Sequence, residues 1–339
     1  MTFTTLCYIE KEDSWLMMHR VKKEKDINKD KWIGIGGHFE TGESPEDCLL
    51  RETLEETGLT LTSYRFRGIL TFLCDDITDY YICLYTADGF TGSLKDCNEG
   101  TLEWVPKDRL TDLNLWEGDL IFFQLLSENA PFFSLKLRYL ENVLKEAVLN
   151  GQVMELLDLA DAQGNPTGQV RERTLVHLYG DRHRTSHVWI VRPDHKGSFE
   201  VLLQKRAAGK DSYPGCYDIS SAGHIPAGCG YLESALRELQ EELGLHTEPE
   251  ELVLLGFHEG NVRSNFHNRP FLNHEYSAVY LLRKDIEPAS LSLQAEEIES
   301  VCWMEYEACL EGIKSGALNH CIFPEEFELL GAKYRTLFS

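Results

Sequence analysis

The sequence lacks long apolar runs, paired cysteines and an excess of positive charge. No apolar run reaches the ~18 residues that span a bilayer, and the first residues show no basic segment followed by an apolar one. The ten cysteines of the 339 residues form no CxxC pair and are too few for a disulfide scaffold. Lys and Arg number 33 against 56 Asp and Glu, and the net charge of -23 repels nucleic-acid backbones and anionic lipids. We therefore expect a cytoplasmic protein with reduced thiols that binds neither nucleic-acid polymers nor membranes.

The length and composition are those of an ordinary globular chain with two cores. At ~150 residues per domain, 339 residues predict two domains. Hydrophobic residues make up 42% and charged residues 26% of the chain, which excludes disordered and fibrous classes. The charge is -11 over residues 1–150 and -12 over residues 151–339, so neither half is an acidic tail.

A repeated segment links the two halves. Residues 37–59 (GHFETGESPEDCLLRETLEETGL) align without a gap with residues 223–245 (GHIPAGCGYLESALRELQEELGL), at a constant offset of 186. The same offset relates Arg20 to Arg206, each at the end of an apolar, strand-like run. Because internal repeats at a fixed offset mark related structural units, two domains of the same fold are predicted.

The chain between the repeats indicates where the domains divide. Residues 135–151 (LKLRYLENVLKEAVLNG) have apolar positions at helical spacing and end at Asn-Gly, which predicts a C-terminal helix for the first domain. The following MELLDLADAQGNPTG predicts a strand and a turn. We expect domains 1–150 and 151–339. Each would have a mixed sheet covered by one central and one C-terminal helix.

The first repeat predicts a helix that gathers carboxylates. Ser44-Pro45 is a strong start signal and Gly58 a natural stop, so the helix covers residues 45–57. Glu52, Glu55 and Glu56 follow at i, i+3 and i+4 on one face, whereas Leu49, Leu50 and Leu54 are expected to face the core. Like charges at this spacing destabilise a helix unless a cation intervenes, and oxygen ligands suit Mg2+ or Mn2+. A solvated acidic surface is the alternative interpretation.

The repeated motif resembles the Nudix box, G-x5-E-x7-R-E-U-x-E-E-x-G-U, where U is a bulky aliphatic residue. The first copy matches every specified polar and glycine position, with Thr53 at a usually aliphatic one. The resemblance to Nudix hydrolases implies two tandem α/β/α sandwich domains, each with a mixed sheet and a loop–helix–loop box. It also implies Mg2+-dependent hydrolysis of a nucleoside diphosphate linkage.

The resemblance also implies roles for the residues of the first copy. The carboxylates hold metal, and Glu52 is the first candidate for general base among them. Arg51 and Glu43 orient the carboxylates, and the Gly37 carbonyl is a further metal ligand. Glu99 resembles the additional metal-binding or base glutamate from a distant loop, with a solvated loop acid as its alternative. The predicted sites are therefore catalytic Glu43, Arg51, Glu52 and Glu56, and metal-binding Gly37, Glu52, Glu55, Glu56 and Glu99.

The first half is similar to MutT-type diphosphatases that remove oxidised purine nucleotides such as 8-oxo-dGTP. Trp116 and Asp119 in LWEGD match positions that stack and hydrogen-bond a purine, and Arg20 is a third substrate-binding candidate. Ile33 stands where these enzymes have Asn, and Gly118 replaces one of two adjacent aspartates. Base selectivity is therefore left open, and a buried core aromatic is the alternative for Trp116.

The second half is similar to Nudix proteins related to isopentenyl-diphosphate isomerase. That family's isomerases use a Cys two residues before a His, but here Ala222 precedes His224, which argues against isomerisation. The family's pair of metal-binding glutamates corresponds to Asn273 and Glu275. In the box, Cys229 replaces the glutamate equivalent to Glu43, and we interpret it as a structural replacement. The metal candidates of this domain are Glu238, Glu241, Glu242 and Glu275.

Three further expectations concern the second domain and the whole chain. His183 and His187 would bind metal together only on a helix, and HVWIV predicts a strand, so ordinary polar roles are favoured. The departures in the second box leave two possibilities, a second hydrolase or a ligand-binding or assembly module without turnover. The expected partner is a small nucleotide, and a homodimer is possible.

Overall fold

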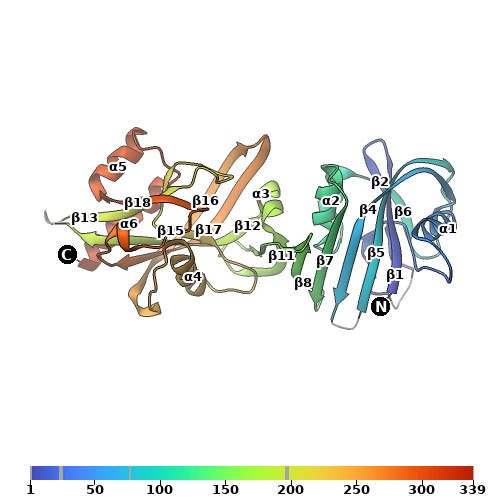
Figure 1. Cartoon of the computed structure of the whole chain (residues 1–339), viewed down its shortest axis with the longest axis horizontal. Helices are drawn as coiled ribbons and strands as arrows, with labels where there is room; N and C mark the ends of the chain where they lie inside the picture. The colour runs from blue at the N-terminus through green and yellow to red at the C-terminus, as the bar shows by residue number, and fades with distance from the viewer. Residues whose placement is uncertain (1, 23–25, 76–77, 195–197, 339) are drawn as a thin grey trace. The chain divides into compact units, whose positions relative to one another are not determined.

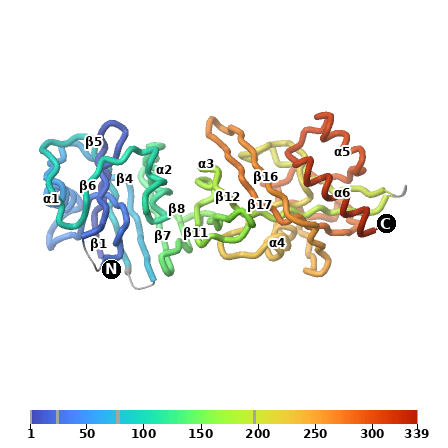
Figure 2. Tube along the Cα trace, turned by 180° about the vertical axis from the view of Figure 1, so that it is seen from behind, coloured from blue at the N-terminus to red at the C-terminus, as the bar shows by residue number. Residues whose placement is uncertain are grey.

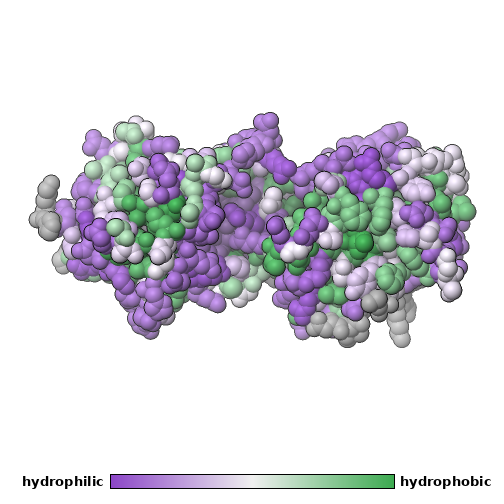
Figure 3. Space-filling model, in the orientation of Figure 1, coloured by the Kyte–Doolittle hydropathy of each residue, from purple (hydrophilic) through white to green (hydrophobic). Residues whose placement is uncertain are grey.

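The computed structural model describes residues 2–22, 26–75, 78–194 and 198–338. The chain divides into two compact units, which we call unit 1 (Met1–Leu156 and Val170–Glu172) and unit 2 (Leu157–Gln169 and Arg173–Ser339). On the face drawn in Figure 3, hydrophilic residues surround smaller hydrophobic areas in both units. Among the described residues, no helix is both long and apolar enough to cross a membrane.

Unit 1 is built on one mixed sheet with the strand order β3-β2-β1-β5-β4-β7-β8-β9, and β6 pairs with β2. The β1–β5 and β4–β7 pairs are parallel, and the other pairs are antiparallel. Helices α1 and α2 flank the strands on opposite sides (Figures 1 and 2). The elements are β1 (Thr2–Lys11), β2 (Ser14–His19), β3 (Trp32–Ile33), α1 (Pro45–Thr57), β4 (Leu59–Cys74), β5 (Thr78–Gly92), β6 (Thr101–Pro106), α2 (Asp119–Ser127), β7 (Phe133–Leu140), β8 (Val143–Leu149) and β9 (Gln152–Val153).

Unit 2 has a mixed sheet in which β12 pairs with β10, β13, β15 and, in parallel, with β17. The sheet continues from β17 to β16 and from β13 to β14 and β18, and β11 pairs with β10. The elements are β10 (Leu156–Ala160), β11 (Pro166–Glu172), α3 (Arg173–Tyr179), β12 (Arg182–Pro193), β13 (Phe199–Arg206), β14 (Tyr217–Asp218), β15 (Ser221–His224), α4 (Tyr231–Leu243), β16 (Leu252–Phe266), β17 (Arg269–Arg283), β18 (Ile298–Glu305), α5 (Tyr306–Ser315) and α6 (Pro324–Phe338).

Alternation along β12 shows how the sandwich of unit 2 forms. Val188 and Ile190 belong to the cluster that contains the buried residues of α4, whereas Trp189 and Val191 belong to the cluster that contains those of α5 and α6. Because successive side chains of a strand point to opposite faces, one central strand supplies both cores. The predicted α/β/α architecture is confirmed.

The predicted helix over residues 135–151 is wrong, because this segment is the β7–β8 hairpin followed by a turn. Leu135, Leu137 and Tyr139 are buried and alternate with less buried residues, which is the period of a strand. Glu141 and Asn142 form the turn with φ of 50° and 63°, as a tight two-residue hairpin turn requires. A single C-terminal helix per domain is also wrong, because strands follow α2 in unit 1 and α5 precedes α6 in unit 2.

Candidate active site

The first box is held in place by helix α1, whose ends match the predicted ones. The Ser44 hydroxyl accepts from the Asp47 N–H at 3.1 Å, and the Asp47 carboxylate accepts from the Ser44 N–H at 3.0 Å. Gly58 ends the helix with φ of 78°. Leu49 faces the core as expected, but the expectation for Leu50 and Leu54 is wrong, because these side chains are 36% and 50% exposed.

Arg51 connects the loop before α1 to the carboxylates on it. Its guanidinium donates to both carboxylate oxygens of Glu43 at 2.6 and 2.9 Å, to Glu52 at 2.7 Å and to the His38 carbonyl at 3.0 Å. The hydrogen bonds from Arg51 lower the pKa of Glu43 to about 2. A fork with two donors in one plane fixes both partners in orientation, so Arg51 positions the Glu52 carboxylate.

Glu56 is a buried carboxyl beside other acids. It is 7% exposed, and Oε2 accepts from the Gly36 N–H at 3.0 Å. Burial, followed by the negative charges of Glu52 and Glu99, raises the pKa of Glu56 to about 8. A divalent cation would reverse this balance, because metal ligands must be deprotonated. The residues therefore fit a hard cation held by oxygen atoms.

Gly37 allows the carboxylate of Glu52 to approach the backbone. A Cβ atom at residue 37 would lie 2.3 Å from the Glu52 carboxyl carbon, and the equivalent Gly223 stands in the same relation to Glu238. Any side chain here would displace the carboxylate, so both boxes need glycine for a steric reason.

A cavity of about 390 Å³ in unit 1 brings most of the predicted site residues together. Of the site residues predicted in the first domain, Glu55 and Glu43 are the two that do not line it. The Glu55 side chain is 61% exposed, and Glu43 contacts the site through Arg51. The predicted residues that line the cavity are Arg20, Gly37, Arg51, Glu52, Glu56, Glu99, Trp116 and Asp119.

Arg20 forms ion pairs with two acids near the carboxylate end of this cavity. It pairs with Glu99 and donates from Nε to Asp26 at 2.7 Å. The Arg20 and Asp26 side chains are 10% and 8% exposed. Glu99 thus lies beside the box, but it is paired with a cation in this structure.

Trp116 is buried, as its alternative interpretation expects, and it also lines the cavity. It is 4% exposed, and its ring packs edge-on against Phe72 and Tyr139 at centroid distances of 5.2 and 4.8 Å. Its Nε1 donates to Asn28 Oδ1 at 2.9 Å. Gly118, which stands where the similar enzymes have an aspartate, also has a steric reason, because a Cβ atom at this residue would lie 2.6 Å from the Tyr139 hydroxyl.

Asp119 is the carboxyl group at the Trp116 end of the cavity. It is 8% exposed, and burial raises its pKa to about 8 against the opposing charge of Lys31. At neutral pH this carboxyl is protonated and can both donate and accept a hydrogen bond.

The second box repeats most of this geometry in unit 2. Glu242 is 6% exposed, accepts from the Ala222 N–H at 3.3 Å, and has a pKa raised to about 8 by burial. Arg237 donates to Glu238 at 2.7 Å. Cys229 offers no carboxylate, so Arg237 lacks the two bonds that Glu43 makes in unit 1. Glu241 is 57% exposed at its side chain.

Glu275 lies in a buried polar cluster centred on β12. It accepts from Asn273 at 3.1 Å, and its carboxylate lies 3.9 Å from His187 Nε2. His187 Nδ1 bonds to the carboxylate of Glu326 on α6 at 2.8 Å, and Trp189 Nε1 donates to the same carboxylate at 2.7 Å. Although burial opposes it, the charge of Glu326 raises the pKa of His187 to about 9.

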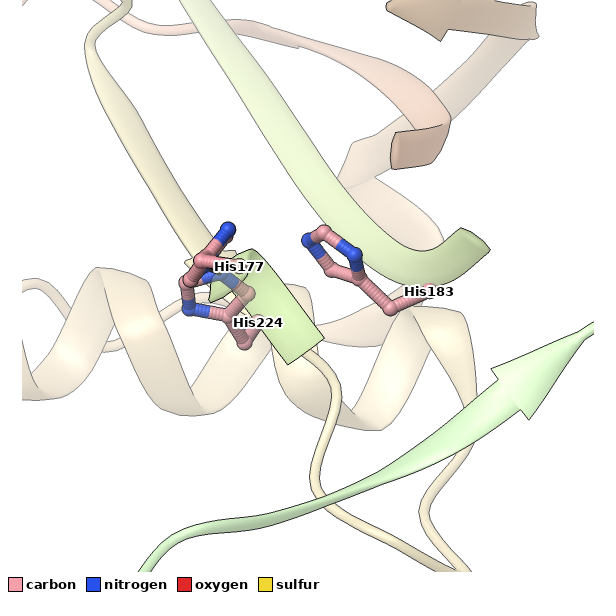
Figure 4. A group of neighbouring side chains, drawn as sticks. All are labelled: His177, His183 and His224. Carbon is pink, nitrogen blue, oxygen red and sulfur yellow. Dashed lines mark hydrogen bonds between the residues drawn. The ribbon is translucent and has the colours of Figure 1, made fainter. Parts of the chain in front are cut away.

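Three histidines form a cluster that the sequence reasoning missed. His177 on α3, His183 on β12 and His224 on β15 place one ring nitrogen each within 4.8 Å of one another (Figure 4). His177 Nε2 and His224 Nε2 are 3.1 Å apart. The strand predicted for HVWIV is confirmed by β12. His183 and His224 were both named from the sequence, but nothing in the sequence placed His177 beside them.

The three imidazoles fit a transition metal better than Mg2+. Burial lowers the pKa of His177 to about 3 and of His183 to about 4, so both rings are neutral at pH 7. His183 Nδ1 pairs with the Asp181 carbonyl, while Nε2 has no hydrogen-bond partner among the described residues. Neutral ring nitrogens of this kind bind Zn2+ and similar ions.

Each unit is an α/β/α sandwich that carries a loop and a glutamate-rich helix, and in unit 1 this helix faces a cavity. This combination of fold and site is that of diphosphate hydrolases that use divalent cations. The NUDIX domain model matches residues 2–126 and 181–320, and the chain therefore belongs to the Nudix family.

Curated relatives match parts of the chain. Nudix hydrolase 3 of Arabidopsis thaliana is 39% identical over 155 residues, which are 45% of this chain but only 19% of that protein. An uncharacterized Nudix hydrolase of Clostridium acetobutylicum is 34% identical over 45% of this chain and 71% of its own length. The oxidized purine nucleoside triphosphate hydrolase of Danio rerio is 29% identical over 32% of this chain and 71% of its own length.

Proposed function

We propose that unit 1 is a Mg2+-dependent hydrolase that cleaves a nucleoside triphosphate, with an oxidised purine dNTP such as 8-oxo-dGTP as substrate and NMP and pyrophosphate as products. One observation carries the proposal: a single cavity joins the carboxylates of the box to the Trp116–Asp119 pair. The cavity therefore has an end that suits metal-bound phosphates and an end that suits a base. The name of the Danio rerio relative supports the same substrate class.

The residues of the cavity supply the chemistry that diphosphate hydrolysis needs. Glu52 and Glu56 would hold Mg2+, with the Gly37 carbonyl and Glu99 as further ligands, and Mn2+ is a possible substitute. The metal supplies charge neutralisation for the phosphate oxygens and lowers the pKa of the attacking water. Glu52, fixed by Arg51, is the first candidate to accept the proton of that water.

Arg20 provides the cationic side chain at the phosphate end of the cavity. In the structure it pairs with Glu99 and Asp26, so a bound phosphate would compete with Glu99 for the guanidinium. Glu99 would then be released to act as a metal ligand.

A substrate panel on the full chain tests the proposal. Oxidised and ordinary dNTPs, dinucleoside polyphosphates, nucleotide sugars and prenyl diphosphates would be assayed with Mg2+. The chain offers a matched pair of variants, because Glu56→Gln and Glu242→Gln change equivalent buried carboxyls of the two boxes. We expect Glu56→Gln to lower the turnover of oxidised purine dNTPs at least 100-fold relative to wild type. Glu242→Gln should keep this turnover within twofold of wild type. If only Glu242→Gln lost this turnover, the reaction would belong to unit 2 and the proposal would be contradicted.

We further infer that unit 2 is a metal-binding module that holds a phosphorylated ligand without hydrolysing it. The three-histidine cluster and the missing carboxylate at Cys229 favour this second role. Ala222 removes the thiol of the isomerase pattern, so no isomerisation is expected. Zn2+ binding to the full chain, measured by calorimetry, should fall at least tenfold in His183→Gln and be unchanged in the surface variant His246→Gln. Prenyl-diphosphate turnover that is lost in Glu242→Gln would contradict the non-hydrolytic role.

A further inference from the structure

A chain of hydrogen bonds runs from the phosphate end of the unit 1 cavity to its base end. Arg20 Nε donates to Asp26 Oδ2 at 2.7 Å, and the Asn28 N–H donates to Asp26 Oδ1 at 3.0 Å. Asn28 Oδ1 in turn accepts from Trp116 Nε1 at 2.9 Å. All four residues line the cavity. The segment 26–28 therefore fixes the position of the Trp116 ring relative to Arg20.

The bond to Trp116 also fixes the orientation of the Asn28 amide. An indole N–H can only donate, so the amide atom that faces it must be the oxygen. Asn28 Nδ2, with two donor hydrogens, is consequently directed away from the indole nitrogen. The usual ambiguity between the oxygen and nitrogen of an asparagine side chain does not arise here.

Apolar and polar side chains both line the cavity. Ile33, Leu70, Phe72 and Ile82 line it with apolar surface, and Asp119 supplies its carboxyl group. The polar groups of a pocket that are held in fixed positions orient the ligand and determine which ligand is accepted. The Asn28 amide is such a group, since its oxygen is committed to the protein and its donors are not needed for that bond.

We propose that Asn28 is a specificity-determining residue of unit 1, whose Nδ2 donates a hydrogen bond to an acceptor atom on the edge of a bound purine. The inference rests on the proposed function of unit 1 and adds the group that reads the base. In guanine this edge carries O6 and N7 as acceptors, whereas in 8-oxoguanine the acceptors are O6 and O8, because N7 carries a hydrogen. The backbone and side-chain bonds to Asp26 and Trp116 hold the amide before the ligand arrives, so little ordering is lost on binding.

Two variants separate the donor group of Asn28 from its hydrogen bond with Trp116. Asn28→Asp keeps an oxygen acceptor for Trp116 but has no donor for the base, whereas Asn28→Ala removes both. Asn114→Ala is the matched control, because the Asn114 side chain holds the same loop through the Asp30 carbonyl and Lys31 but does not line the cavity. Tryptophan fluorescence of the full chain would report whether the surroundings of the indole rings change.

The kinetic experiment uses the full chain with Mg2+ and four probes. They are 8-oxo-dGTP, dGTP, which lacks O8, the 2-aminopurine dNTP, which lacks both O8 and O6, and base-free deoxyribose 5′-triphosphate as an inhibitor. We expect Asn28→Asp to raise KM for 8-oxo-dGTP about tenfold with kcat within twofold, as loss of one hydrogen bond to a substrate requires. The KM effect should shrink for the analogue that lacks the contacted acceptor. Inhibition by the base-free triphosphate should be unchanged, and Asn114→Ala should behave as wild type.

The failing outcomes are distinct. An unchanged KM in both Asn28 variants would overturn the inference and leave the proposed function standing. The same holds if Asn28→Asp weakened inhibition by the base-free triphosphate as much as it raised KM for 8-oxo-dGTP. Absence of turnover of every nucleotide by the wild-type protein would instead overturn the proposed function, and the inference with it.

Discussion

Replacement of Glu56 by Gln should make metal-free unit 1 more stable while it removes activity. The carboxyl is 7% exposed, and its pKa is raised from 4.5 to about 8. At pH 7 the unfolded chain ionises this group, whereas the folded chain keeps the proton. Holding it costs about 1.4 kcal/mol for each pH unit above 4.5, which gives about 3 kcal/mol at pH 7. Gln is neutral at every pH and its amide oxygen can still accept from Gly36, so the variant avoids this cost.

The pH dependence of this stability difference follows from the raised pKa of Glu56. An acid with a raised pKa in the folded state costs nothing below its ordinary pKa, and it lowers stability progressively as pH rises from about 4.5 to about 8. The advantage of Glu56→Gln should therefore grow from near zero at pH 4.5 to about 3 kcal/mol at pH 7. With Mg2+ the order should reverse, because the ion stabilises the ionised wild-type carboxylate.

Hydrogen exchange followed by mass spectrometry on the full chain measures this locally. Peptides from α1 in EDTA at pH 5, 6 and 7 would give the opening free energy of unit 1 for wild type and variant. Glu242→Gln is the control, since it should act on peptides from α4 and not from α1. Equal opening free energies of wild type and Glu56→Gln at pH 7 would refute the buried, protonated carboxyl from which this reasoning starts.

Three other predictions concern the remaining ionic groups and the metal. Arg51→Lys should lower kcat on the best nucleotide at least tenfold with the fold intact, because a lysine cannot make both bonds to Glu43; activity within twofold of wild type would contradict the positioning role. Glu326→Gln should lower the free energy of unfolding of unit 2 by about 3 kcal/mol at pH 6, since His187 loses its buried counter-ion. The difference should shrink as pH rises toward 9, where His187 of the wild type loses its proton and with it the stabilising ion pair. Urea unfolding at pH 6 and 9 tests this, and a pH-independent difference would count against the His187–Glu326 ion pair. EDTA should abolish hydrolysis and excess Mg2+ restore it; turnover that persists in EDTA would exclude the metal-dependent reaction.

Local signals in the sequence were sufficient for the box helix. Ser44, Pro45 and Gly58 act on their immediate neighbours, and a helix whose ends are fixed by caps needs no distant partner to be located. The repeat at offset 186 likewise identified two units of one fold, because it needs only comparison of the chain with itself.

Short-range patterns failed where distant packing decided the outcome. Residues 135–149 contain apolar positions that suit both a helix and a strand, and pairing of β7 with β4 selects the strand. Leu50 and Leu54 are apolar, but this part of α1 buries Cys48, Leu49 and Thr53 instead. The choice in each case depends on which surface is available for burial, and the local sequence does not contain that information.

The sequence by itself determined the family motif and the carboxylates on α1. Only the tertiary structure decided that Trp116, Asp119 and Asn28 share a cavity with Glu56, and that three histidines from α3, β12 and β15 meet in unit 2. The physical reason is that a motif is fixed by contacts between neighbours in the chain. A pocket is instead made by segments that are distant in the chain and meet only in the folded protein. Asn28 and Trp116, for example, are 88 residues apart.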